Sequence, residues 1–210
     1  DMGTLAGVPF IFEAVFENID VKRELFSKLD AICGDDVVYA SNTSSIAITE
    51  MASLVKRPGR FVGMHFFNPV PMMRLVEVIP AMQTEKSVTE LAMAMAVKLG
   101  KTPITCKDTP GFVVNRLLIP YMLDAVRLLE AGVASAQDID TAMKLGAGMP
   151  MGPFELMDFT GVEISHLVGE IFYGYTKEAR FASPGLLRNM VSAGYLGRKT
   201  GKGFYEYPPK

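Results

Sequence analysis

The N-terminal half of the chain alternates apolar runs of strand length with amphipathic helical patterns. Strand-like runs occupy residues 9–15, 36–42 and 60–66, and helical patterns at 19–34 and 44–55 separate them. Such alternation is typical of parallel strands joined by right-handed helical crossovers. We therefore expect an α/β fold with a parallel sheet, to which residues 73–79 and 103–106 add two further strands.

Helical patterns dominate the rest of the sequence. A helix with a capping box, Ser87 and Glu90, is expected at residues 87–101, before the last strand. Further helices are predicted at residues 108–132, 135–146, 152–172 and 183–194. This change of character divides the chain into an α/β domain, residues 1–107, and a nearly all-helical domain, residues 108–210.

Composition excludes several classes of function. The 210 residues carry a formal net charge of −2 and no long basic run, so nothing indicates a partner among nucleic acids. Apolar runs are too short to span a membrane. The two cysteines, Cys33 and Cys106, form no metal-ligand spacing, and we expect both to be buried, reduced thiols of an intracellular protein that holds no metal.

One histidine stands at the end of a predicted strand. His65 closes "RFVGMH", and the next strand carries a single acid, Glu77, in the apolar run "LVEVI". If "NPVP" turns the chain back, Glu77 faces His65 and makes it a general base. The alternatives are a core histidine bonded to backbone and an edge strand with Glu77 in solvent.

More polar residues follow the other predicted strands, at the edge where open parallel sheets bind ligands. They are Glu13, Glu17 and Asn18 after the first strand, Ser41 to Ser45 after the second, and Asn68 after the third. Each hydroxyl in "SNTSS" also suits an N-cap, although the cluster is longer than a cap needs. Asn115 is a single polar residue in the apolar run "FVVNRLL", and it is either a site residue or a helix residue that faces solvent. His166 has no acid nearby and is interpreted as structural.

Two glycine-rich segments imitate nucleotide loops. "GAGMPMG", residues 146–152, follows a helix rather than a strand, and a helix stop followed by a turn explains it. "GRKTGKGF" lacks the spacing of a phosphate-binding loop. Neither segment is predicted to bind a nucleotide.

Five segments together resemble the L-3-hydroxyacyl-CoA dehydrogenase family of fatty-acid β-oxidation. They are "SNTSSI", "GMHFFNPVPMMRLVEVI", "CKDTPGFVVNRLLIPY", "DIDTAMKLGAGMPMGPFELMD" and "RKTGKGFY". The resemblance covers nearly the whole chain in family order. It implies the C-terminal part of a Rossmann-like parallel sheet followed by an all-α domain, with NAD as cofactor and an acyl-CoA thioester as substrate. It also implies a homodimer formed through the helical domain, and the animal-type enzyme suggests the mitochondrial matrix, or the cytoplasm for a prokaryotic protein.

The resemblance also implies roles for individual residues. His65 matches the catalytic base, and Glu77 matches the carboxylate that orients it. Ser44 and Asn115 match the pair that hydrogen-bonds the reacting oxygen. Positions that match contacts to the cofactor are Glu17, Lys22, Ser44, Asn68 and Lys199.

The sequence departs from the family at its start. The family opens with a strand, a glycine-rich phosphate loop and a helix, and none of these precedes residue 9 here. We therefore expect a partial NAD-binding domain and a chain with little or no activity by itself. Two other functions stay open: a non-catalytic oligomerisation module, and a related dehydrogenase of free hydroxy or sugar acids.

Overall fold

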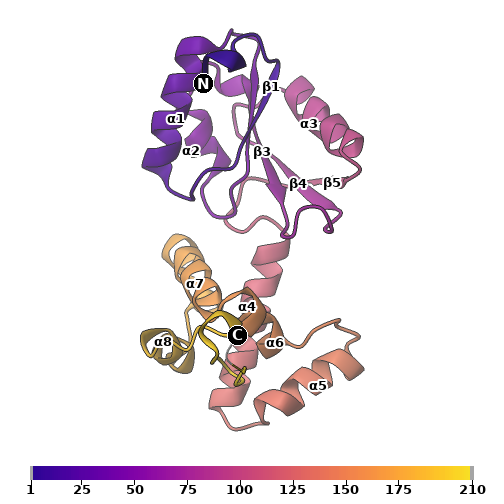
Figure 1. The fold of residues 1–210 in the computed structure, drawn as a ribbon, viewed down its shortest axis with the longest axis vertical. Coiled ribbons are helices and arrows are strands. Elements are labelled where there is room, and N and C mark those ends of the chain that lie inside the picture. The colour runs from indigo at the N-terminus through magenta and orange to yellow at the C-terminus, as the bar shows by residue number, and fades with distance from the viewer. Residues whose placement is uncertain (1, 209–210) are drawn as a thin grey trace. The chain divides into compact units, whose positions relative to one another are not determined.

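The computed structural model describes residues 2–208, which divide into two compact units between Val113 and Val114 (Figure 1). Each unit has its own hydrophobic core. No helix within residues 2–208 combines the length and the hydropathy needed to cross a membrane.

The first unit is a five-stranded sheet with helices on both faces. Its strands are β1 (Phe10–Glu13), β2 (Val38–Ser41), β3 (Phe61–Phe66), β4 (Leu75–Pro80) and β5 (Thr102–Thr105), in that order across the sheet. Its helices are α1 (Ile19–Ile32), α2 (Ile48–Ala52) and α3 (Lys86–Lys98), with short 3-10 turns η1 (Met2–Leu5) and η2 (Pro58–Arg60). The α/β prediction with a predominantly parallel sheet is confirmed.

One strand pair runs against the expected direction. β3 and β4 are antiparallel, whereas the other three pairs are parallel. Parallel neighbours need a crossover of a dozen or more residues, and the loop at residues 67–74 is too short to supply one. The chain therefore turns back beside β3.

Alternation of side chains along the strands builds a core on each face. In β2, Tyr39 joins the core under α1 and α2, while Val38 and Ala40 join the core under α3. Figure 1 shows α1 and α2 on one side of the sheet and α3 on the other. β2, β3 and β4 are buried on both faces, which explains their nearly continuous apolar sequence.

Several predicted helix boundaries were wrong. The capping box is absent, because α3 begins one residue before Ser87 and Glu85 is its N-cap. α2 covers only the later part of residues 44–55. The long pattern from residue 108 becomes helix only at Val114, since Gly111 and Phe112 have φ angles of 78° and 48°.

The second unit is helical. It contains α4 (Val114–Glu130), α5 (Ala136–Gly146), α6 (Pro153–Thr160), α7 (Val162–Thr176) and α8 (Gly185–Ser192), with 3-10 turns η3 (Ala179–Phe181) and η4 (Arg198–Thr200). The predicted helix at residues 152–172 is two helices, because Gly161 adopts a φ of 109° between them. The core is formed mainly by α4, α6, α7 and α8, with Ile139 of α5 and Phe181 of η3.

Candidate active site

His65 and Glu77 lie directly opposite each other on β3 and β4. Opposed residues of an antiparallel pair have neighbouring side chains, and here His65 Nδ1 lies 2.7 Å from Glu77 Oε2. Glu77 has no exposed surface and His65 is 7% exposed. The edge-strand alternative is wrong, because β5 pairs with the far side of β4.

The contact assigns the proton to one ring nitrogen when Glu77 is ionised. An ionised carboxylate only accepts hydrogen bonds, so it faces a protonated Nδ1 and leaves the lone pair of Nε2 free. The second oxygen of Glu77 accepts from the backbone N–H of Val113 at 3.0 Å. Phe67 and Phe112 pack against the imidazole, with ring centroids 4.6 and 5.5 Å away. The pair is a partly enclosed proton acceptor.

The Cys106 thiol lies near the same carboxylate. Partial burial, with the negative charges of Glu77 and Asp108, raises the pKa of Cys106 to about 12. A neutral thiol is a poor nucleophile, so Cys106 is no candidate for covalent chemistry. Both cysteines are free, and both are partly rather than fully buried.

Glu17 organises the polar loop after β2. Its Oε1 accepts from the hydroxyls of Thr43 and Ser45, at 2.5 and 2.9 Å, and from the backbone N–H groups of Ser44 and Ser45. Burial opposes ionisation of Glu17, but the hydrogen bonds from Thr43, Ser45 and Ser44 outweigh it and lower the pKa of Glu17. The carboxylate therefore holds the loop in shape at neutral pH.

Ser44 is the member of this loop whose hydroxyl is free. The hydroxyls of Ser41, Thr43 and Ser45 bond to Glu13 or Glu17, whereas that of Ser44 makes no hydrogen bond within the described residues. None of the serines caps α2. Its N-cap is Ala47, and the carboxylate of Asp108 accepts the N–H groups of Ile48 and Thr49 instead. The capping interpretation is therefore wrong, and Ser44 is available to a ligand.

Lys22 is enclosed rather than open. Its Nζ donates to both carboxylate oxygens of Glu13, at 2.7 and 2.8 Å, and the lysine is fully buried. The Ser41 hydroxyl also donates to Glu13, at 2.5 Å. Glu13 and Ser41 are paired in register as the last residues of β1 and β2. This buried pair stabilises the carboxyl edge of the sheet.

The remaining predicted residues lie on three other elements. Asn68 is exposed in the loop after β3, at a cis bond to Pro69. Asn115 lies half-buried in the first turn of α4. Lys199 lies in η4 and pairs with Glu163. Asn115 and Lys199 belong to the second unit, and their parts in a site with His65 stay predictions.

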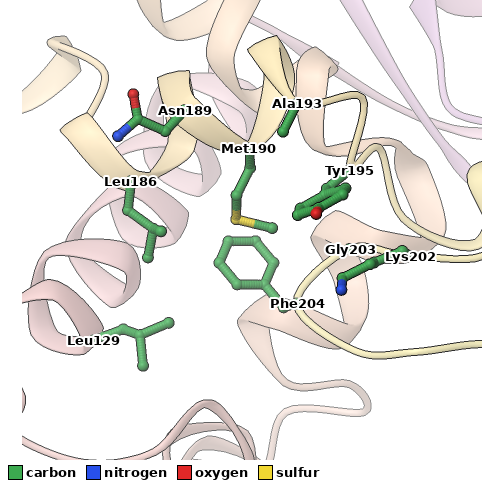
Figure 2. Close-up of a pocket in the computed structure, with 9 residues that line it drawn as sticks. All are labelled: Leu129, Leu186, Asn189, Met190, Ala193, Tyr195, Lys202, Gly203 and Phe204. Carbon is green, nitrogen blue, oxygen red and sulfur yellow. The ribbon is translucent and has the colours of Figure 1, made fainter.

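The carboxyl edge of the sheet is hollowed beside this cluster. An open, mostly apolar hollow of about 340 Å³ is lined by Phe12, Glu13, Ala14, Asn42, Phe66, Val70 and Leu99. Asn42 Oδ1 also accepts the N–H of Phe66, which ties the end of β2 to the end of β3. Figure 2 shows another hollow, of about 410 Å³, between α8, the end of α4 and the C-terminal segment. It contains none of the predicted site residues.

The glycine-rich segments pack against buried carboxylates. Asp140 accepts the N–H groups of Phe154 and Glu155 at the start of α6, and a Cβ on Gly152 would lie 2.3 Å from the Asp140 carboxyl carbon. Asp158 holds the C-terminal segment through Phe204 and Tyr205, and Gly203 gives it room. These glycines give the two carboxylates room, and α5 ends at Gly146, where the sequence predicted a helix stop.

Comparison with known proteins identifies the family. The sequence model of the 3-hydroxyacyl-CoA dehydrogenase NAD binding domain matches residues 1–109, and that of the C-terminal domain matches residues 111–207. The chain belongs to the 3-hydroxyacyl-CoA dehydrogenase family. In this family member, His65, Glu77, Ser44 and Glu17 all lie within the part matched by the NAD binding domain.

Relatives from animals and bacteria match closely. Mouse mitochondrial hydroxyacyl-coenzyme A dehydrogenase is 50% identical over 198 residues, which are 94% of this chain. A 3-hydroxybutyryl-CoA dehydrogenase of Clostridioides difficile is 44% identical over 97% of this chain and 72% of its own. The crystal structure of (S)-3-hydroxybutyryl-CoA dehydrogenase from Ralstonia eutropha, at 44% identity, superposes with a TM-score of 0.97 over all of this chain and 74% of that one. The chain described here spans 63% of the length of the mouse relative.

Sequence reasoning did not find the contacts behind the site. The Glu13–Lys22 pair, the Val113 N–H and the rings of Phe67 and Phe112 were all missed. Gly111 was a usable signal, since a glycine after proline marks a turn inside the predicted helix. The Val113 N–H could not be predicted in this way, because every residue except proline has a backbone N–H.

Proposed function

We propose that the protein catalyses the NAD-dependent oxidation of L-3-hydroxyacyl-CoA to 3-ketoacyl-CoA, with His65 as general base. The observation that carries the proposal is the buried contact between His65 Nδ1 and Glu77, which leaves Nε2 as the proton acceptor. Membership of the 3-hydroxyacyl-CoA dehydrogenase family supports the reaction and the substrate class.

The residues at the carboxyl edge fit a dinucleotide. The free hydroxyl of Ser44, the exposed amide of Asn68 and the loop braced by Glu17 surround an edge where cofactors bind in open α/β sheets. We assign NAD to these three residues. Lys22 would reach the cofactor only through Glu13, because its Nζ is enclosed. When bound, NAD supplies the hydride acceptor.

The protein's own part in the reaction is proton transfer and orientation. His65 Nε2 takes the proton of the substrate 3-hydroxyl as the carbon loses hydride. Glu77 stabilises the imidazolium that forms, and the low-dielectric surroundings strengthen this interaction. The Ser44 hydroxyl hydrogen-bonds the reacting oxygen. In the reverse direction, protonated His65 donates to the 3-ketone.

The substrate class separates this reaction from that of a dehydrogenase of free hydroxy acids. NADH oxidation is measured with acetoacetyl-CoA and with acetoacetate. The assays use the chain by itself and a fusion protein that adds the part of the mouse relative outside the matched residues. Turnover of the thioester in preference to the free acid is expected. Preference for the free acid, or no turnover by the folded fusion protein, would contradict the proposal.

A homodimer formed through the helical unit is the second part of the proposal. Ile164, Leu167, Ile171 and Tyr175 recur at helical spacing on α7, and each is at least 45% exposed. An exposed apolar stripe of this kind suits association with a second copy. Sedimentation should give a dimer that Leu167→Glu disrupts. A dimer without turnover in either assay form would favour the non-catalytic oligomerisation module.

We infer the mitochondrial matrix as the location. The support is the 50% identity to the mouse protein named as mitochondrial, against 44% to the Clostridioides difficile protein. A cytoplasmic location would follow for a prokaryotic source. Fractionation of the source cells tests the inference, and a cytosolic signal from a eukaryotic source would overturn it.

A further inference from the structure

A left-handed turn precedes the helical unit. Gly111 and Phe112 have φ angles of 78° and 48°, and Phe112 is one of two described non-glycine residues with a positive φ. The conformation is unfavourable for a bulky L-residue, so the surrounding structure must hold it in place. Filling the core does not require it, because a phenylalanine can be buried from an ordinary backbone conformation, as Phe26 is in the same hydrophobic cluster.

The turn makes two contacts with the candidate active site. The ring of Phe112, which is 4% exposed, packs against His65 with the ring centroids 5.5 Å apart. The next residue, Val113, donates its backbone N–H to Glu77 Oε1 at 3.0 Å. Both members of the histidine–carboxylate pair therefore touch consecutive residues of one short segment.

The two contacts restrict different motions: one that of the His65 ring, the other that of the Glu77 carboxylate. A hydrogen bond to Nδ1 alone still allows the imidazole to rock about its bond to Cβ, and aromatic rings packed against it restrict that movement. Phe67 supplies one ring and Phe112 the other. The Val113 N–H restrains Oε1 of Glu77 and so limits rotation of the carboxylate. Oε2 therefore stays directed at Nδ1 of His65.

We propose that Phe112 is a positioning residue for the His65–Glu77 pair. Its ring restrains the imidazole plane, and its left-handed backbone presents Val113 N–H to Glu77. The inference rests on the proposed function, in which Nε2 of His65 is the base. It adds a residue that touches neither substrate nor cofactor in that proposal and acts through His65.

Nuclear magnetic resonance of the imidazole nitrogens tests this without requiring turnover. The chain has two histidines, so His166, hydrogen-bonded to Ser183 at 2.8 Å, serves as an internal reference. Phe112→Leu keeps apolar bulk but removes the aromatic ring. Phe26→Leu is the matched control, since Phe26 is a fully buried aromatic of the same core that meets Tyr39 and Phe61 edge-on instead.

In the unsubstituted protein we expect one His65 tautomer, with the proton on Nδ1. Phe112→Leu should give exchange-broadened or mixed-tautomer signals for His65 and leave His166 unchanged, while Phe26→Leu leaves both unchanged. In the assay form that turns over, Phe112→Leu should lower kcat about tenfold with KM within about twofold. A His65 spectrum in Phe112→Leu identical to that of the Phe26→Leu control would overturn the inference. A mixture of His65 tautomers in the unsubstituted protein would instead count against the proposed function.

Discussion

Two glutamates are buried in strands of the same sheet, and each has a different basic partner. Glu13 pairs with Lys22, whose Nζ is fully enclosed and lies 2.7 Å from the carboxylate. Glu77 pairs with His65, whose imidazole has a second ring nitrogen that can accept or donate a proton in acid–base catalysis. The first partner suits a permanent ion pair and the second suits proton transfer. The chemistry of the site therefore depends on which base faces which buried acid.

Charge removal should separate these two roles. Glu13→Gln leaves the buried Lys22 ammonium uncompensated and should cost about 3–5 kcal/mol of the free energy of unfolding. Glu77→Gln leaves a histidine that can stay neutral, so it should cost only about 1 kcal/mol, while kcat falls about a hundredfold. Urea unfolding and the NADH assay measure the two effects. Equal stability losses with unchanged activity would contradict the assignment.

The lowered pKa of Glu17 predicts that this residue contributes to stability in a pH-dependent way. Its pKa in the folded state is lowered from 4.5, so its stabilising effect is present above pH 4.5 and is lost as the pH falls through the folded-state value. Glu17→Gln should therefore lower the free energy of unfolding by about 1 kcal/mol at neutral pH, reduced by solvent exposure, and by less in acid. Urea unfolding across this range tests the sign. A cost that grows as the pH falls below 4.5 would contradict it.

At the scale of elements, the close approach of α2 to the sheet depends on Gly63 of β3. A Cβ at Gly63 would lie 2.6 Å from Ile48 Cδ1 and 2.8 Å from Ile48 Cγ1. Gly63→Ala should cost about 1–3 kcal/mol by overpacking. Gly34→Ala is the matched control, because nothing lies within 4 Å of its added Cβ.

The substitution Ile48→Val tests whether contact with Ile48 causes the destabilisation by Gly63→Ala. The shorter side chain loses Cδ1, so the double substitution Gly63→Ala with Ile48→Val should be less destabilised than the two single costs added together. Thermal unfolding of the four proteins gives the coupling. Additive costs would mean that contact with Ile48 is not the reason for the glycine.

The elements differ in how far the sequence predicted them. All five strands were predicted, because short apolar runs bounded by turn residues carry their own signal. The direction of β4 and the short length of α2 were not, because they depend on a loop too short for a crossover and on Asp108, sixty residues from Ile48. Within the site, His65 and Glu77 were predicted together, whereas the availability of Ser44 depends on which neighbouring hydroxyls bond to Glu13 and Glu17.

At the scale of the whole molecule, two units with separate cores should respond separately to damage. A Cβ at Gly203 would lie 2.1 Å from Asp158 Oδ1, at the carboxylate that holds the C-terminal segment. Gly203→Ala should raise amide hydrogen exchange at residues 196–207 and in α6, and leave β1 to β5 protected as before. Gly146→Ala, in open space, is the control. Loss of protection throughout both units would show one cooperative body.

Replacing each histidine in turn tests the central claim, that His65 is the base. NADH oxidation with acetoacetyl-CoA is compared for the unsubstituted protein, His65→Asn and His166→Asn, in the chain and in the fusion protein. We predict at least about a hundredfold loss of kcat in His65→Asn and a change within about twofold in His166→Asn. Full turnover by correctly folded His65→Asn would contradict the account.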